Sequence, residues 1–219
     1  MTLLQRIKTV KTRLPSHVTL VAAAKTRSPQ QVLDCIDAGI AWVGHNYVQE
    51  AQSMIDQIGR DAAHWTMIGH LQRNKAKVAV RLFDSIQTVD SLRLAKAIDR
   101  ECKKISRIMP ILIEVNAARE PQKAGAFPED VRDLITEVAK FEAISVKGLM
   151  TMGPAVQDPE ALRPVFRETK SLFDALAAAK IPRVAMETLS MGMSSSYEIA
   201  VEEGATMIRL GTTLFGPRT

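Results

Sequence analysis

The chain has 219 residues, of which 46% are apolar and 24% are charged, and its formal net charge is +5. This composition is typical of an ordinary globular protein. No apolar run approaches the roughly 18 residues of a membrane span, and the first 15 residues contain no cleavable secretion signal. We therefore expect a protein without a membrane segment.

Two further features of the sequence narrow the class of protein to which it can belong. Cys35 and Cys102 are far apart and form no CxxC motif, which argues against a zinc or redox site and favours reduced thiols in the cytoplasm. Basic residues alternate with acidic ones, and the densest basic cluster, from Arg73 to Arg81, has no aromatic residues to stack on bases. We expect no nucleic-acid binding.

In chain order, an amphipathic helix in the first 15 residues precedes an apolar strand within residues 18–27. Ser28 and Pro29 then resemble an N-cap and a first helical residue. Further strands are predicted at 41–44, 64–68, 83–89, 109–115, 144–150, 184–189 and 205–210. Helices are predicted at 28–38, from 46 onward, at 72–80, from 90 or 91, and at 128–141, 160–179 and 194–203.

This alternation of strand and helix predicts a parallel sheet with right-handed crossovers. Eight repeats favour a closed (β/α)8 TIM barrel over an open sheet, and no GxGxxG fingerprint follows a strand. No full helix follows the last strand, so the N-terminal helix is expected to cover that gap. With no linker in the sequence, we expect a single domain over residues 1–219.

Lys25 stands at the end of the first strand, in the segment VTLVAAAKTR. A lysine leaving an apolar strand can present a partly desolvated amine, which forms a Schiff base with an aldehyde. The alternative is a lysine that only reaches out to solvent from a strand end, and this segment alone favours the alternative.

Two loops near the C-terminus favour the first interpretation. In a barrel of this kind, phosphate often binds to the loops after strands seven and eight. The loop SMGMSSS contains Ser190 and Ser194, and the loop RLGTT contains Gly211 and Thr212. Each loop alone could be a simple helix cap or turn, but together they favour an anion site.

A phosphate site beside a Schiff-base lysine is the combination that binds pyridoxal 5′-phosphate (PLP). Arg209 lies on the strand between them, and an arginine on this strand could be placed near the pyridine nitrogen. Arginine only donates hydrogen bonds, so it would keep that nitrogen unprotonated and weaken the ring as an electron sink. Taken alone, Arg209 is better explained as a salt bridge at the barrel rim.

The segments AAAKTR, NYVQE, IGHLQRNK, VDS, GLMTMGP, LSMGMS and IRLGTTLFG occur in this order along nearly the whole chain. This combination resembles the pyridoxal phosphate homeostasis proteins, the YggS/PROSC family, whose fold is similar to the barrel domain of alanine racemase.

The resemblance implies that Lys25 carries PLP as a Schiff base. It implies that Arg209 faces the pyridine nitrogen and that Asn46 and Met193 line the pocket. The phosphate would be held by Ser190, Ser194, Gly211 and Thr212. Two positions depart from the family pattern: His45 and Ser196 stand where the family usually has acidic residues.

Three functions remain open at this stage. The protein is a non-catalytic PLP carrier that buffers or delivers the cofactor, a small PLP-dependent amino-acid racemase or related PLP enzyme, or a barrel for another phosphorylated ligand. In alanine racemases a second domain carries a catalytic tyrosine, and we expect no such domain after Thr219. This expected absence and the presence of Arg209 both favour the carrier. Its expected partners are PLP, apo PLP-dependent enzymes and free amino acids, and we expect a monomer.

Overall fold

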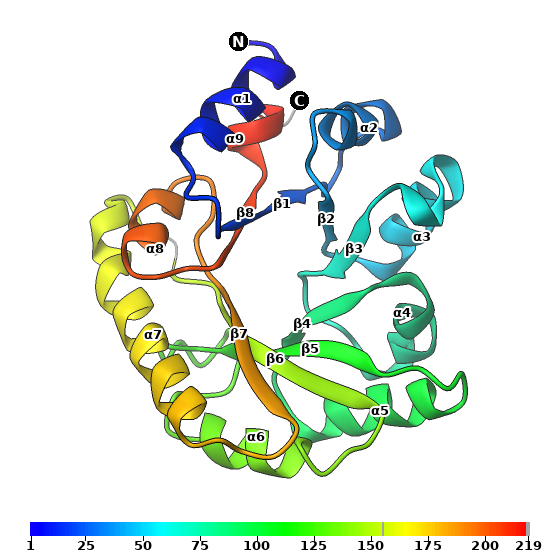
Figure 1. Ribbon diagram of the computed structural model, residues 1–219, viewed down its shortest axis with the longest axis vertical. Helices are drawn as coiled ribbons and strands as arrows, with labels where there is room; N and C mark the ends of the chain where they lie inside the picture. Colours follow the sequence, from blue (N-terminus) through cyan, green and yellow to red (C-terminus); the bar gives the residue numbers. More distant parts are fainter. Residues whose placement is uncertain (155, 218–219) are drawn as a thin grey trace.

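The computed structural model describes residues 1–154 and 156–217 and contains a closed barrel of eight parallel strands in sequence order (Figure 1). The strands are β1 (Thr19–Ala23), β2 (Trp42–His45), β3 (His64–Met67), β4 (Ser85–Val89), β5 (Met109–Val115), β6 (Ile144–Thr151), β7 (Val184–Ser190) and β8 (Met207–Leu210). The predicted TIM-barrel fold is confirmed.

Helices cover the outside of the barrel in Figure 1. They are α1 (Leu3–Arg13), α2 (Pro29–Asp37), α3 (Val48–Ile58), α4 (Ala76–Leu82), α5 (Leu92–Lys103), α6 (Val131–Val138), α7 (Arg163–Ala178), α8 (Tyr197–Glu202) and α9 (Thr212–Phe215). Three short 3-10 turns, η1 (Arg60–Ala62), η2 (Arg73–Lys75) and η3 (Pro159–Leu162), lie before β3, α4 and α7.

Helices α1, α2 and α5 begin at side chains that cap them. The Ser28 hydroxyl accepts a hydrogen bond from the backbone N–H of Gln31, and the Gln31 side chain bonds back to the N–H of Ser28. With Pro29 at the first turn, this capping box fixes where α2 begins. Ser91 caps α5 in the same way through the N–H of Leu94.

Several predicted helix bounds are wrong. The helix predicted at 194–203 begins only at Tyr197, and the one predicted at 128–141 spans only Val131–Val138. The segment 72–80 starts as the 3-10 turn η2 before α4. The short helix α9 after β8 was not predicted at all. Helix ends depend on tertiary contacts, which local propensity does not encode.

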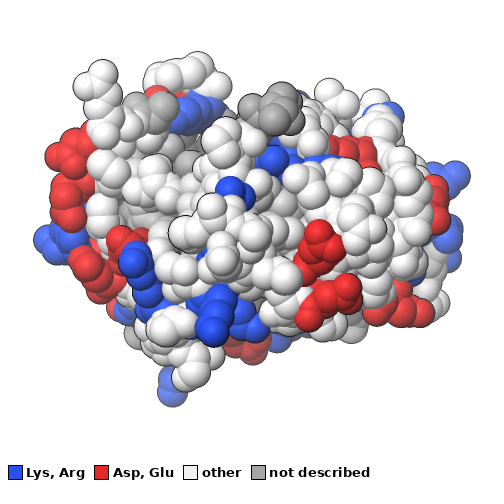
Figure 2. Space-filling view, turned by 90° about the horizontal axis from the view of Figure 1, so that it is seen from above, with Lys and Arg blue, Asp and Glu red and all other residues white. Residues whose placement is uncertain are grey.

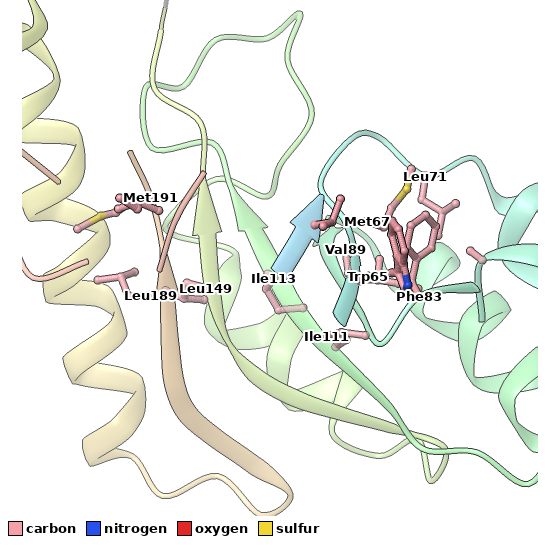
Figure 3. Packing of buried hydrophobic residues seen from close by; sticks show 14 of the residues in the cluster. Trp65, Met67, Leu71, Phe83, Val89, Ile111, Ile113, Leu149, Leu189 and Met191 are labelled. Carbon is pink, nitrogen blue, oxygen red and sulfur yellow. The ribbon is translucent and has the colours of Figure 1, made fainter. Parts of the chain in front are cut away.

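Buried side chains form two layers. The outer layer lies between strands and helices and is apolar: in Figure 3, Trp65, Met67 and Phe83 pack on one side of the view, and Leu189 and Met191 on the other. The inner layer fills the barrel and includes polar groups. The Ser190 hydroxyl on β7 reaches Gln87 on β4, and because these strands are not neighbours, this bond crosses the barrel interior.

The N-terminal helix completes the helical layer where α9 is too short to do so. In Figure 1, α1 lies beside α9, close to β8 and β1. Arg6 of α1 donates a hydrogen bond to the backbone carbonyl of Leu214 in α9, and Ile7 and Val10 are buried in the outer layer. The position expected for the first helix is therefore observed.

Charged side chains of both signs are interspersed over the face shown in Figure 2. This pattern agrees with the alternation of basic and acidic residues along the helices. Among the described residues, no helix is long and apolar enough to cross a bilayer.

Gly148 provides a test of barrel geometry. It lies at a register shift between β6 and β7 with φ +147°, and a Cβ there would overlap the carbonyl oxygen of Thr188. Gly59 has φ +106° but open space around it. We expect Gly59→Ala to lower the free energy of unfolding by about 1–2 kcal/mol and Gly148→Ala by at least about 3 kcal/mol. Urea denaturation measures both, and equal losses would contradict the close approach of β6 and β7.

Candidate functional site

One pocket of about 540 Å³ opens at the C-terminal ends of the strands. This size is suitable for a cofactor-sized ligand. The residues that line it are Ala23, Lys25, Asn46, Ile68, Met152, Met193, Ser194, Ser195, Arg209, Gly211, Thr212 and Thr213. They lie in the last residues of β1 and β8 or within five residues after β1, β2, β3, β6, β7 or β8, because a closed parallel barrel brings these strand ends to one face.

Lys25 lies two residues beyond β1, half-buried at the pocket wall. Its Nζ lies 5.3 Å from the centroid of the Tyr47 ring, a cation–π contact. The chain turns away at Thr26, which has a φ of +62° and donates its N–H to the carboxylate of Glu50. This bond to α3 fixes the turn, so the turn directs Lys25 along the pocket rather than out to solvent.

Asn46 follows β2 and lines the pocket. The end of β3 passes so close that a Cβ on Gly69 would overlap the Asn46 carbonyl. The hydroxyl of Thr88 donates to the Gly69 carbonyl at 2.7 Å, and Gly69 is thereby held in place from β4. Two partly exposed methionines, Met152 and Met193, form the apolar part of the pocket lining together with Ala23 and Ile68.

Backbone donors converge at one end of the pocket. The N–H groups of Gly211 and Thr213 both lie 3.1 Å from the Ser194 hydroxyl oxygen. They belong to the start of α9, where backbone N–H groups have no partner within the helix. A Cβ on Gly211 would have only ordinary contacts with Ala23, so the glycine leaves space in the pocket. This end can accommodate an anionic oxygen.

Arg209 on β8 lies at the buried end of the pocket and is only 3% exposed. It donates hydrogen bonds to the Ser190 hydroxyl (2.6 Å) and to the Thr151 carbonyl (2.9 Å). Burial lowers the pKa of Arg209 to about 10, so it remains charged at neutral pH. Both of these acceptors are uncharged groups. The guanidinium has only N–H donors, so it can accept no hydrogen bond from a ligand.

Glu114 on β5 lies in the barrel interior near Arg209 and is 3% exposed. Burial and, to a smaller extent, the nearby Asp90 carboxylate raise the pKa of Glu114 to about 7, against the lowering effect of Arg209. Its Oε2 atom has no hydrogen-bond partner among the described residues. Glu114 is therefore an acid that is partly protonated at neutral pH, beneath the pocket rather than in its wall.

The two departures from the expected family pattern lie outside the pocket lining. His45 is fully buried in the outer layer, where it stacks on Trp65 at 5.9 Å between ring centroids. Burial lowers the pKa of His45 to about 4, so it is neutral. The Ser196 hydroxyl accepts from the N–H of Met193 and thereby shapes the loop before α8.

Seven of the eight site residues predicted from the sequence surround this one pocket: Lys25, Asn46, Met193, Ser194, Arg209, Gly211 and Thr212. Ser190 does not line it; its hydroxyl is fully buried and bonded to Arg209 and Gln87. Ala23, Ile68, Met152, Ser195 and Thr213 line the pocket but were not predicted. These residues are adjacent in sequence to the predicted site residues or motifs, and this adjacency could have identified them.

The helix that presents its N-terminus to the pocket differs from the predicted one. The sequence indicated a helix starting at Ser194, but α8 begins three residues later. The converging donors come from α9 instead. This difference arises because Ser194 reaches across to the β8 loop, a contact between residues 17 positions apart.

Comparisons with known proteins agree with this geometry. The family model described as "Alanine racemase, N-terminal domain" matches residues 2–219. A pyridoxal phosphate homeostasis protein of Aquifex aeolicus (strain VF5) is 37% identical over 91% of this chain and 86% of its own. One of Escherichia coli (strain K12) is 34% identical over 94% and 88%.

Solved structures show the same fold. PipY of Synechococcus elongatus PCC7942 without PLP has a TM-score of 0.92 at 32% identity, covering 98% of this chain and 100% of PipY. The form with PLP bound has a TM-score of 0.90 at 31% identity, with the same coverage. An alanine racemase of Clostridium difficile 630, at 15% identity and a TM-score of 0.81, shares the fold over 56% of its own length.

The raised pKa of Glu114 predicts a pH dependence of stability. In the window between the ordinary glutamate pKa of 4.5 and about 7, the folded state binds more protons than the unfolded state. The free energy of unfolding therefore falls as pH rises through this window, by roughly 2–3 kcal/mol in total. Glu114→Gln removes this loss, so relative to wild type the variant should be more stable at pH 8 than at pH 5.

Urea unfolding at both pH values measures the effect, and the contribution of His45 cancels in the difference. Asp133→Asn, on the exposed side of α6, is the matched control and should show no such trend. A difference between Glu114→Gln and wild type that stays constant with pH would contradict the buried acid.

Proposed function

The chain belongs to the family of alanine racemase N-terminal domains, among the pyridoxal phosphate homeostasis proteins, and on this premise we propose that it binds PLP on Lys25. The observation that carries the proposal is the pocket that contains Lys25, a buried guanidinium and a cradle of backbone N–H donors. PLP has the three groups that these features fit: an aldehyde, a ring nitrogen and a phosphate. PipY, a structure at 31% identity, has PLP bound.

The donor cradle is suited to the phosphate. The N–H groups of Gly211 and Thr213 converge on one point, now taken by the Ser194 hydroxyl, and Thr212 lies between them. A phosphate dianion there gains charge-assisted hydrogen bonds and the favourable end of the α9 peptide dipoles. The missing side chain at Gly211 lets the phosphate approach the backbone.

Lys25 supplies the covalent anchor. Its amine is half-buried on the pocket wall, beside the Tyr47 ring and within the same lining as Arg209 and Gly211. When bound, PLP supplies an aldehyde for Schiff-base formation and a ring that can accept electrons. We propose that Asn46 and Met193 limit the space at the sides of the ring.

Arg209 would set the electronic character of the cofactor. Its pKa of about 10 keeps it charged, and it can only donate a hydrogen bond to the ring nitrogen. A nitrogen that accepts a hydrogen bond without gaining a proton is a weaker electron sink than a protonated one. Ser190, which is bonded to Arg209, is proposed to hold the arginine rather than to contact the phosphate.

We propose a carrier rather than an enzyme. Racemisation needs one base on each face of the substrate carbon. Among the described residues lining the pocket, the titratable side chains are Lys25 and Arg209. Tyr197 is directed elsewhere, since its hydroxyl donates to Glu198. The names of the curated relatives, homeostasis proteins, point in the same direction.

The role would be to hold and release PLP inside the cytoplasm. Free amino acids, whose amines can displace Lys25 from the cofactor, and apo PLP-dependent enzymes are its proposed partners. The partly exposed Met152 and Met193 in the pocket lining leave an adaptable opening for exchange. The barrel buries its core within one chain, which supports a monomer.

Reduction with borohydride tests the covalent site. After incubation with PLP, the wild-type protein should absorb visible light and carry a pyridoxyl group on the peptide that contains Lys25. Lys25→Ala should lose both signals, whereas Lys77→Ala, at an exposed lysine of α4, should keep both. A colourless wild-type protein with unmodified Lys25 would refute PLP binding at this site.

Isotope exchange distinguishes the carrier from an enzyme. In deuterated water, L-amino acids incubated with the PLP-loaded protein should keep their Cα hydrogens, because the pocket provides no second base. Mass spectrometry or proton NMR follows the exchange, with a PLP-dependent racemase as positive control. Exchange as fast as in that control would identify an enzyme.

A further inference from the structure

Gln87 on β4 is a polar side chain that the proposed site does not use. It is 1% exposed, lies in the barrel interior, and is absent from the pocket lining. Its Oε1 accepts a hydrogen bond of 2.7 Å from the Ser190 hydroxyl. The same hydroxyl oxygen is 2.6 Å from the Arg209 guanidinium, so Gln87 is linked to Arg209 through one intermediate.

The donor and the acceptor in each of these hydrogen bonds follow from the groups that the side chains carry. Arginine carries only donors, so the Ser190 oxygen must accept from Arg209. The single hydroxyl proton of Ser190 must then be donated elsewhere, and Gln87 Oε1 is its acceptor. This orients the amide, and its Nε2 donates to Thr66 Oγ1 and to Met207 Sδ, both at 3.2 Å.

This series of hydrogen bonds crosses the barrel from β8 to β3. Thr66 Oγ1 is 2.7 Å from the Ser85 hydroxyl, which closes the chain at the far wall. Among the described residues, the Arg209 guanidinium has one other hydrogen bond, to the Thr151 carbonyl. One of its two contacts is therefore fixed by the backbone of β6, and the other depends on a serine whose orientation depends on Gln87.

We propose that Gln87 is a positioning residue that, through Ser190, holds the Arg209 guanidinium at the buried end of the pocket and thereby sets the protonation of the group facing it. The first half concerns the protein alone. The second half rests on the proposed function, in which that group is the pyridine nitrogen of PLP.

Removing the acceptor has a defined consequence. In Gln87→Met, an unbranched side chain of similar size keeps the packing but offers no strong acceptor to Ser190. The Ser190 hydroxyl then has no strong acceptor for its proton, so its orientation toward the Arg209 guanidinium is no longer fixed. The guanidinium gains freedom to move or to admit water. Gln87→Glu keeps an oxygen acceptor for Ser190 and should restore the position.

The first measurement uses the apo protein and does not depend on PLP. Side-chain ¹⁵N NMR reports the exchange of the Arg209 N–H protons with water. Gln87→Met and Ser190→Ala should each speed this exchange about tenfold or more. Gln87→Glu and the control Met207→Leu, which removes only the weak sulfur acceptor, should remain within about twofold of wild type.

The second measurement uses the PLP-loaded protein. In Gln87→Met we expect the pH titration of the visible absorbance to shift by about half a unit or more, and PLP to dissociate about 5- to 10-fold faster. The double variant Gln87→Met with Ser190→Ala should equal the stronger single variant, because both substitutions break one chain. Met207→Leu should match wild type in both readouts.

The outcomes distinguish the proposed PLP binding from the positioning role of Gln87. If the wild-type protein binds no PLP, the proposed function fails, while the NMR result still decides whether Gln87 holds Arg209. Unchanged N–H exchange in Gln87→Met and Ser190→Ala would overturn the positioning role even if PLP binds to Lys25. Additive effects in the double variant would also overturn it.

Discussion

Closure of the eight-stranded parallel barrel is the constraint on which the structure depends. A closed barrel removes sheet edges and brings all eight strand ends to one face, but its interior must then be filled with side chains. In this chain the outer layer is apolar, whereas the interior includes the polar groups Gln87, Glu114, Ser190 and Arg209. Gln87, Ser190 and Arg209 find hydrogen-bond partners in each other, whereas one carboxylate oxygen of Glu114 has no partner among the described residues.

The buried guanidinium of Arg209 illustrates the cost and the use of that arrangement. A buried charge is expensive unless it is hydrogen-bonded. Two neutral acceptors meet part of the requirement, and a partly protonated Glu114 lies nearby. A cation held in this way at the end of a pocket is suited to a ligand atom with a free lone pair. The same geometry underlies the proposal that the protein carries the cofactor.

Folding connects residues that local patterns treat separately. Ser194 belongs to the loop after β7, yet its hydroxyl satisfies the start of α9 after β8. The turn that directs Lys25 is fixed by a hydrogen bond from the N–H of Thr26 to the carboxylate of Glu50, which lies on α3. These two site residues are therefore placed by elements other than their own, which is why their positions require the folded barrel.

The amino-acid sequence by itself determined the barrel, its strand order and most of the pocket. Alternating apolar strands and capped helices specify the barrel locally, and a closed parallel sheet then places Lys25 and the glycine- and serine-containing loops together. Only the tertiary structure decided that Ser190 is bonded to Arg209 instead of lining the pocket, that α9 presents its N–H donors, and that His45 faces the helices. Those features depend on side-chain direction and on contacts between distant segments, which periodicity does not contain.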